Sequence, residues 1–535
     1  MIRFLLRKFG LAHLRKESPS TPEGKLLHSD LEENLALFRE ELGNSPDVII
    51  RRFTLNLRNE LKSAVLFIDG LIDQQVIYDS ILYPLMIEAK KEKWAVKGHL
   101  IDFIEDNLLT VGGVDKDDRM PGLVAAVLAG DSVLLVDGCD QALAISTKGW
   151  EKRSITEPDT EQTIKGPREG FTENIRTNTA MLRRKIADPG LKFEQMKIGE
   201  RTGTTVSIAY VKGIVNEKLV EEVRRRLKRI NTDMVLDANY LSEFISDAPF
   251  SPFPTVAFTE RPDVTAAKLL EGRVAIFVDG TPVVNTAPTL FIESFQNPDD
   301  YNFHFLFATM IRWIRYLAFF LGILLPAFFV ALTTYHQELI PTPLLISMAA
   351  AMEGVPFPIV IEVVAMGAVF EILREAGVRL ARPIGQTISI VGALVIGQAT
   401  VAAGLVAAPT VIVIALTAIA SFVVPTQQEI GIILRLGLTF LAGILGAYGI
   451  LVGLLLTLIH LTSLRSFGVP YLSPIIPLSI EDQKDVIVRA PLWAMWTRPR
   501  SIGWPRPIRQ GFGQSPTSPE ETAGKDWSRP DDKKG

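Results

Sequence analysis

Apolar positions divide this chain into two parts of different character. Up to about residue 300, short runs of four or five apolar residues alternate with stretches of mixed charge and polarity. From Trp313 onward the apolar runs become long enough to cross a bilayer core of about 30 Å, and they cover 313–334, 343–376, 386–407, 409–424 and 431–461. The pattern predicts an α/β cytosolic N-terminal region of two subdomains, followed by an all-α multi-pass transmembrane domain.

One local pattern, an apolar run ending in Asp-Gly, occurs three times in the first part: AVLFIDG at 64–70, SVLLVDG at 132–138 and VAIFVDG at 274–280. A short continuous apolar run is typical of a buried strand, and Asp-Gly favours a tight hairpin turn. The second and third copies precede another strand-like run, so we expect two hairpins, whereas IDQQVIYDSILYPLM after the first copy indicates a helix. We interpret the three aspartates as turn residues rather than as carboxylates sharing a site.

A β–α unit is predicted at 204–230. Strand-like TTVSIAYVKG (204–213) precedes NEKLVEEVRRRLKRI (216–230), in which Glu222 stands four residues before Arg226, the favourable order for a helical ion pair. The interleaved glutamates indicate a solvated helix face rather than a nucleic-acid surface. Shifts in composition predict an N-terminal extension at 1–30, α/β subdomains at 31–150 and 151–300, a transmembrane helical domain at 311–465, a basic juxtamembrane segment at 466–510 and a disordered tail at 511–535.

Composition narrows the function further. The net charge of −4 does not indicate a nucleic-acid partner, and the single cysteine, Cys139, cannot form an intramolecular disulfide. Because the chain lacks a phosphate-binding loop, a dinucleotide fingerprint, a zinc-protease motif and a nucleophile elbow, we expect neither a cofactor nor enzyme activity. Residues 1–16 do not have the pattern of a signal peptide, and Arg312 and Arg315 stand at the leading edge of the first apolar run, which predicts a cytosolic N-terminal region.

Longer stretches of the sequence resemble the A subunit of the GerA family of spore germinant receptors. The resemblance covers about 45–480, and it is carried by GPREGFTENIRTNTAMLRRKI (166–186), DAPFSPFPTVAFTERPD (247–263), GRVAIFVDGTPVVNTAPTLFIESFQNPDDY (272–301), PLLISMAAAMEGVPFPIVIEVVAMGAVFEILREAGVRL (343–380) and GQTISIVGALVIGQATVAAGLVAAPTVIVIALTAIASFVVP (385–425). It implies a multi-pass protein of the spore inner membrane that acts with a permease-like B subunit, which binds the nutrient, and a lipoprotein C subunit. It also implies a homo-oligomeric ring, a pentamer, around a pore for monovalent cations, with no bond made or broken.

The segment 386–407 is the candidate pore lining, because it combines polar residues with several glycines. Thr387 and Gln398 are eleven residues apart, which places them on nearly one helix face about 16 Å apart. Val391 and Leu394 lie between them and would form an apolar gate that dewets when closed. The alternative is that small and polar residues here mediate close helix packing.

Two further positions are candidates for roles in the pore. Glu362 lies in the acidic stretch 343–376 and could attract cations to a pore mouth, since carboxylates in membrane segments are costly and by default functional. The alternative is interfacial structure, because Gly354, Pro356 and Pro358 divide this stretch. Pro326 should kink the first span and could serve as a hinge or as a fixed packing feature.

The topology is left with two solutions. Five single crossings would put the C-terminus outside, whereas the basic segment 466–510 favours the cytosol. For a cytosolic C-terminus, one apolar segment must re-enter the membrane or cross it twice. We take 341–376 as the first choice for that segment and 431–461 as the second. The composition of WAMWTRPRSIGWPRP (493–507) suits contact with membrane lipid at the interface.

Other functions also agree with the sequence. A scaffold subunit without its own pore and a secondary transporter are the alternatives to a channel. A ligand could also bind the soluble region directly, with Arg168, Arg176 and Arg201 as candidate anion contacts, although exposed structural arginines are commoner.

Overall fold

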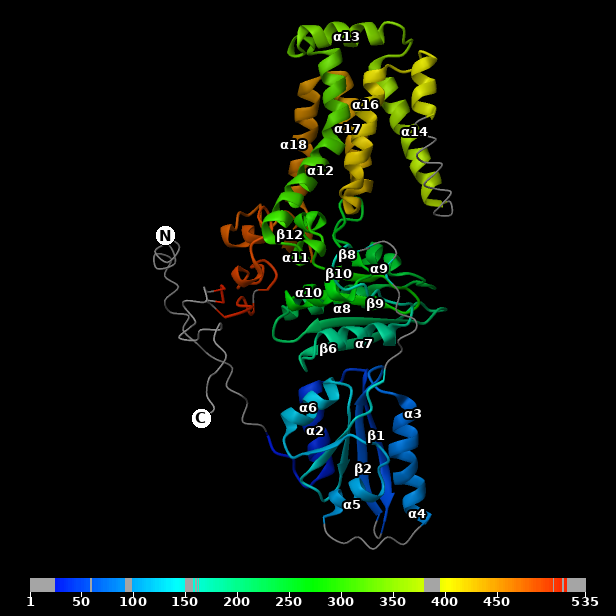
Figure 1. Cartoon of the computed structure of the whole chain (residues 1–535), viewed down its shortest axis with the longest axis vertical. Coiled ribbons are helices and arrows are strands. Elements are labelled where there is room, and N and C mark those ends of the chain that lie inside the picture. Colours follow the sequence, from blue (N-terminus) through cyan, green and yellow to red (C-terminus); the bar gives the residue numbers. More distant parts are fainter. Residues whose placement is uncertain are drawn as a thin grey trace, which may run out of the picture.

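The computed structural model of the protein describes residues 25–57, 60–91, 99–149, 157–158, 161, 163–379, 395–503, 505–511 and 514–516. Two α/β subdomains and a bundle of helices follow one another along the longest axis, in chain order (Figure 1). The C-terminal segment returns to the junction between the second subdomain and the bundle. The prediction of two α/β subdomains followed by a helical region is confirmed.

Subdomain 1 contains a five-stranded antiparallel sheet with strand order β1-β2-β4-β5-β3. Ala64 and Leu66 of the inner strand β2 pack with one helical layer, and the intervening Val65 packs with the other. Because helices cover both faces, the inner strands are apolar at successive positions. The elements are α2 (Leu31–Leu42), β1 (Val48–Asn56), β2 (Glu60–Ile68), α3 (Gln74–Ile77), the π-helical η2 (Tyr78–Leu82) and η3 (Pro84–Glu88), α4 (Ala89–Lys91), α5 (Leu100–Asn107), β3 (Val114–Asp117), α6 (Met120–Leu128), β4 (Ser132–Val136) and β5 (Ala142–Ile145).

Subdomain 2 contains a second five-stranded sheet, with order β6-β7-β9-β10-β8. Its elements are α7 (Ile175–Lys185), β6 (Leu191–Ile198), β7 (Thr204–Val211), α8 (Glu217–Arg229), α9 (Ala238–Ile245), β8 (Ala257–Thr259), α10 (Pro262–Leu270), β9 (Val274–Val278) and β10 (Val284–Ala287). Ile208 of β7 packs with α8 and α9, and the next residue, Ala209, packs with α7 and α10 on the opposite face. The predicted β–α unit is β7 followed by α8, and the ion pair between Glu222 and Arg226 forms at 2.8 Å.

Subdomain 2 repeats the architecture of subdomain 1. The strand orders correspond one to one, α7 takes the place of α2, and α10 takes the place of α6. Single hydrogen bonds also correspond: Asp137 accepts from the N–H of Leu31 at the start of α2, and Asp279 accepts from the N–H of Ile175 at the start of α7, both at 3.2 Å. The two predicted hairpins, β4–β5 and β9–β10, are confirmed. Their connections are longer than the tight turns that we expected, and each aspartate also holds the start of a helix.

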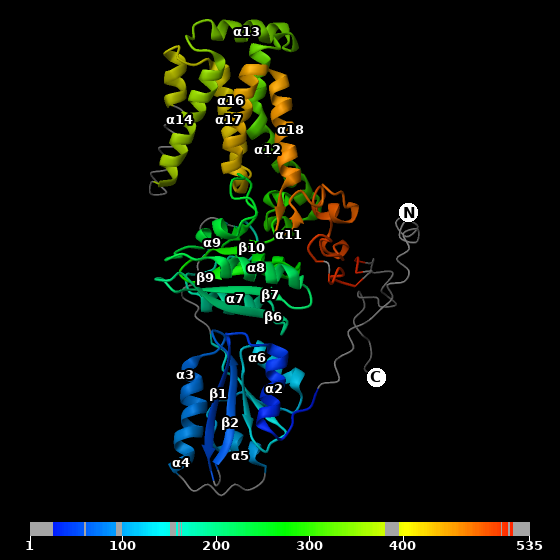
Figure 2. The same ribbon diagram turned by 180° about the vertical axis from the view of Figure 1, so that it is seen from behind.

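The helices of the C-terminal part are mostly apolar. After the 3₁₀ turn η4 (Phe291–Phe295) they are α11 (Asp299–Asn302), α12 (Phe305–Thr334), η5 (Gln337–Leu339), α13 (Thr342–Met352), α14 (Ile359–Arg379), the helical residues 395–402, α16 (Ala408–Phe422), η6 (Pro425–Gln427), α17 (Gln428–Leu445) and α18 (Ala447–Ser463). Within the described residues, two helices are long and apolar enough to cross a membrane, Phe305–Thr334 and Pro425–Leu445. α12 packs against α16 and α17, and α13 lies across the end of the bundle farthest from the subdomains (Figures 1 and 2).

One reversal of the chain direction in the bundle lies within 431–461, the second choice from the sequence. The segment 431–461 forms two helices, α17 and α18, which are joined at Gly446 with φ of +64°. Our first choice, 341–376, also forms two helices: α13 lies across the bundle end and α14 runs along the bundle (Figure 1), and how this segment crosses a membrane stays a prediction. The positive φ, which favours glycine, is what allows the sharp reversal at 446. As a result α18 ends beside subdomain 2, where His460 bonds Ser251 at 2.8 Å.

The segment after α18 ties the bundle to subdomain 2. It forms the short hairpin of β11 (Arg465–Ser466) and β12 (Val469–Pro470), followed by the 3₁₀ turns η7 (Ile480–Asp485) and η8 (Leu492–Ala494). The Ser466 hydroxyl donates to the carbonyl of Thr255, and the Arg498 guanidinium donates to the carbonyl of Leu270, both at 2.6 Å. Part of the basic character of 466–510 therefore serves contacts within the protein.

A buried cluster of charges joins this segment to the base of α12. Arg312 is fully buried, and its guanidinium lies 3.1 Å from the carboxylates of both Asp300 and Asp485. Arg315 contacts Asp300 at 2.8 Å, and Arg489 donates to the carbonyl of Tyr301 at 3.1 Å. Arg312 and Arg315 thus bind carboxylates of the protein.

Candidate functional site

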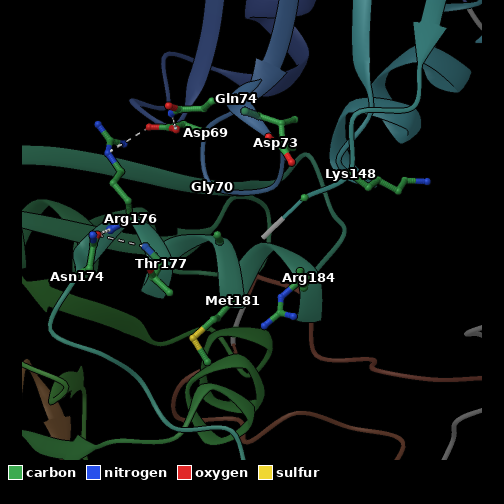
Figure 3. A pocket seen from close by; sticks show the side chains of 13 residues that line it. Asp69, Gly70, Asp73, Gln74, Lys148, Asn174, Arg176, Thr177, Met181 and Arg184 are labelled. Atoms are coloured by element: carbon green, nitrogen blue, oxygen red, sulfur yellow. Dashed lines mark hydrogen bonds and ion pairs between the residues drawn. The ribbon is translucent and has the colours of Figure 1, made fainter. Parts of the chain in front are cut away.

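A cleft with a volume of about 690 Å³ lies between the two α/β subdomains (Figure 3). One wall comes from the loop after β2 and the residues after β5, and the other comes from α7. The polar side chains of both walls are Asp69, Asp73, Gln74, Lys148, Asn174, Arg176, Thr177 and Arg184. Carboxylates, amides and cations therefore border one space.

The wall from subdomain 2 is the first part of α7. This helix begins at its cap Asn174, whose side-chain oxygen accepts from the N–H groups of Arg176 at 2.8 Å and Thr177 at 3.4 Å. The cap fixes Arg176 and Thr177 on the first helical turn, and Arg184 follows about two turns later. In Figure 3 the side chain of Arg176 points from α7 toward the loop that carries Asp69, whereas Thr177 and Arg184 point away from that loop.

The wall from subdomain 1 is the loop that carries the first Asp-Gly pair. Asp69 follows β2, and Asp73 caps α3 by accepting from the N–H of Gln75 at 2.9 Å. Gly70 has a φ of +88°, and a Cβ added there would lie 2.9 Å from the Cβ of Ala180 on α7. A side chain at position 70 would therefore force the two walls apart.

Two contacts beside the cleft fasten the subdomains to each other. Arg183 and Asp47, each only 1% exposed, form a two-pronged ion pair with distances of 2.8 and 3.3 Å. Lys192 of subdomain 2 donates to the carbonyl of Glu41 in subdomain 1 at 2.8 Å. Burial, reinforced by the Arg183 cation, lowers the pKa of Lys192 to about 8.

The cleft is suited to a small molecule that carries both charges. Arg176 lies 3.7 Å from Asp69 and donates to the carbonyl of Pro46 at 3.2 Å. Because Arg176 does not form a two-pronged ion pair with Asp69, its guanidinium can still bind the carboxylate of a ligand in that way. Asp69 and Asp73 can accept from an ammonium group, and Arg176 can bind a carboxylate. Within the described residues, no group of three or more His, Cys, Asp or Glu is placed to hold a metal ion.

Only one of the three arginines predicted as anion contacts lies in the cleft, and that one is Arg176. Arg168 is 65% exposed and lies 3.9 Å from Glu157, and Arg201 is exposed in the turn between β6 and β7. Asp69, which we interpreted from the sequence as a turn residue, lies in the acidic wall of the cleft together with Asp73, which no sequence pattern singled out. The available signal was that the first Asp-Gly pair, unlike the other two, precedes a helix.

The pore and gate candidates lie only partly within the described residues. Thr387, Val391 and Leu394 are outside them, so their roles stay predictions. Gln398 is exposed on the helical residues 395–402. Pro326 is buried inside α12, and the helix continues through it from Phe305 to Thr334.

Glu362 is buried between α14 and α16, with 3% of its surface exposed. Its carboxylate accepts from the N–H of Ala407 at 2.8 Å and from the hydroxyl of Thr410 at 3.1 Å. These bonds give Glu362 a role in holding the start of α16, and its predicted place at a pore mouth is untested. A second carboxylate of α14, Glu371, forms an ion pair with Arg435 of α17 at 2.6 Å.

Comparison with known proteins gives consistent matches. A family model described as Bacillus/Clostridium GerA spore germination protein matches residues 36–501. Spore germination protein KA of Bacillus subtilis (strain 168) is 45% identical over 493 residues, 92% of this chain and 90% of that protein. Spore germination protein GerLA of Bacillus cereus is 40% identical over 484 residues, 90% of this chain and 97% of that protein. The crystal structure of the N-terminal domain of the A subunit of the Bacillus megaterium spore germinant receptor GerK3 matches 50% of this chain and 98% of that chain at 40% identity, with a TM-score of 0.41.

Proposed function

This chain belongs to the GerA family of Bacillus/Clostridium spore germination proteins, as its resemblance predicted, and from this membership we propose that it is the A subunit of a nutrient germinant receptor. In this proposal it lies in the spore inner membrane, acts with a permease-like B subunit and a lipoprotein C subunit, and relays nutrient binding to the release of monovalent cations. No chemical bond is made or broken in this role.

The observation that carries a sensing role is the cleft between the subdomains. Its walls bring Asp69 and Asp73 opposite Arg176, so the ammonium and the carboxylate of an amino acid would each meet an opposite charge. We place a direct ligand contact there, in addition to the nutrient site that the family resemblance assigns to the B subunit. Because the ligand would touch both subdomains, its binding would favour one relative orientation of the two.

The proposed conducting part is the helical bundle. α12, α14, α16, α17, α18 and the segment that contains 395–402 would give six passes, with both chain ends in the cytosol. A cytosolic C-terminus agrees with the basic composition of 466–510. A pentameric ring would surround a pore lined by Thr387, Val391, Leu394 and Gln398. A scaffold subunit without a pore is the second candidate, supported by the buried packing role of Glu362.

Potassium efflux from spores tests both parts. If Val391 and Leu394 form the gate, shortening either to alanine should leak potassium without nutrient, whereas Gln398→Ala should reduce the nutrient-triggered efflux. Normal efflux in all three variants would favour the scaffold. For the cleft, Arg176→Ala should shift the nutrient response to at least tenfold higher concentration, and the exposed Arg201→Ala is the matched control. Equal responses of these two variants would contradict a ligand site in the cleft.

A further inference from the structure

A row of large aliphatic side chains is exposed on the loop 472–480, which follows the β11–β12 hairpin and which we name the collar loop. Leu478 and Ile480 are 70% and 80% exposed, and Ile475 and Ile476 are 40% and 43% exposed. Single exposed apolar residues are ordinary, but adjoining ones on one loop indicate a surface that is covered in use.

A second exposed apolar surface lies where the chain after η7 meets the base of α12. The indole N–H of Trp313 donates to the carbonyl of Ile487 at 2.8 Å, and the N–H of Arg489 donates to the hydroxyl of Thr309 at 3.1 Å, so the chain after η7 lies along the first turns of α12. Along this contact both partners expose apolar side chains, namely Met310, Trp313, Ile314, Ile487, Val488, Leu492 and Trp493.

In the C-terminal segment the acidic side chains are buried or paired, whereas several arginines are exposed. Asp482 is 8% exposed and accepts from the hydroxyl of Ser479 at 2.9 Å, and Asp485 is bound by Arg312. Glu481 is exposed but forms an ion pair with Arg500. By contrast three exposed arginines form no ion pair within the described residues: Arg465, Arg506 and Arg509. The outward face of this segment is therefore both apolar and basic.

The collar loop lies at the level where a membrane surface would be. In both views the first, orange part of the segment after α18 sits beside α11, at the level between the bundle and subdomain 2, and its last, red part lies at the level of subdomain 2 (Figures 1 and 2). α12 has 30 residues and is about 45 Å long, which exceeds a hydrocarbon core of about 30 Å by about 15 Å. The first turns of α12, which contact the C-terminal segment, would therefore stand in the headgroup layer.

We propose that the collar loop inserts its aliphatic side chains into the cytosolic leaflet of an anionic bilayer, with the exposed arginines binding lipid phosphates. This inference rests on the proposed membrane placement of the helices. Exposed aliphatic side chains and exposed arginines in one segment are the composition that binds an anionic interface, where tryptophan is also favoured. The contact would hold the buried cluster around Arg312, and with it subdomain 2, at a set distance from the membrane.

The test uses the full chain with Cys139→Ala, reconstituted in vesicles of equal parts phosphatidylglycerol and phosphatidylcholine. A polarity-sensitive fluorophore is attached at Leu478→Cys, and nitroxide-bearing lipids serve as quenchers. The aqueous control is Leu26→Cys, a leucine of subdomain 1 that is 58% exposed, and the membrane control is Leu456→Cys near the middle of α18, 60% exposed. We expect blue-shifted emission and at least twofold stronger quenching at position 478 than at position 26. Reversing Arg506 and Arg509 to glutamate should weaken the quenching at 478.

Four results would overturn all or part of the inference. Quenching at 456 but not at 478 would refute the lipid contact while leaving the membrane placement intact, whereas no quenching at 456 would refute the membrane placement itself. Shielding at 478 only after addition of the B subunit would assign the surface to a protein partner. Unchanged quenching at 478 after replacement of Arg506 and Arg509 by glutamate would show that these arginines do not bind lipid phosphates.

Discussion

Replacing Arg312 by alanine should release the C-terminal segment from the base of α12. The arginine is fully buried, contacts Asp300 and Asp485 at 3.1 Å each, and donates to the carbonyl of Asp485 at 2.6 Å. In the variant, Asp300 keeps Arg315 as its partner at 2.8 Å. The loss therefore falls mainly on Asp485, which is the residue that the C-terminal segment contributes.

The size of the effect follows from the burial of the pair. Removing one partner of a buried ion pair costs about 3–5 kcal/mol. Burial already raises the pKa of Asp485, and Arg312 is the strongest opposing influence, so without it the carboxyl group would take up a proton more readily. Protonation limits the cost to the low end, about 3 kcal/mol, which corresponds to roughly 100-fold more frequent opening of the segment, at 1.4 kcal/mol per factor of ten.

Hydrogen exchange measured by mass spectrometry on the purified full chain would report this opening in peptides covering 480–495. Arg312→Ala should exchange there about 100-fold faster than the parent, with subdomain 1 unchanged. Arg315→Ala is the control and should change exchange less than tenfold, because Arg312 still binds both carboxylates. If peptides 480–495 of Arg312→Ala exchange at a rate within threefold of the parent, the buried pair does not hold the segment, and the prediction is refuted.

Three other perturbations test separate contacts. Gly70→Ala should separate the cleft walls because its Cβ would lie 2.9 Å from Ala180, so the nutrient response should weaken at normal protein levels; an unchanged dose response would contradict this. Lys192 has a pKa near 8 in the fold against about 10.4 when unfolded, so the unfolded chain binds more protons between these values. The melting temperature should therefore rise from pH 8 to pH 10 relative to Lys192→Met, and parallel pH profiles would refute the assignment. Glu362→Ala should cost about 1–3 kcal/mol in detergent unfolding because Ala407 N–H loses its acceptor, whereas Glu362→Gln, which keeps an acceptor oxygen, should cost less.

Local patterns in the sequence were enough to predict most of the secondary structure. The continuous apolar runs before Asp-Gly are the central strands β2, β4 and β9, because helices on both faces leave no solvent-facing position. The interruption at 354–358 separates α13 from α14, since proline and glycine do not continue a helix. The spacing of Glu222 and Arg226 identified α8. Each of these signals depends only on neighbours within a few residues.

The structural repeat of the two subdomains could not be predicted from such local patterns. What the subdomains share is strand order and a pair of aspartate-to-helix bonds, Asp137 to Leu31 and Asp279 to Ile175, whose partners are 106 and 104 residues apart. The cleft depends on the same kind of separation, because Asp69 and Arg176 come from different subdomains. Such pairs leave no periodic trace in the sequence.

The sequence alone determined the order of the parts, the apolar character of the C-terminal half and, through its long matching phrases, the family. The three-dimensional fold was needed to see that the basic residues Arg312 and Arg498 bind protein groups, that Glu362 holds the start of α16, and that the chain turns back at Gly446. The physical reason is that burial and partnership set the role of a charged side chain. Both depend on residues far along the chain, whereas helix and strand formation depends on residues nearby.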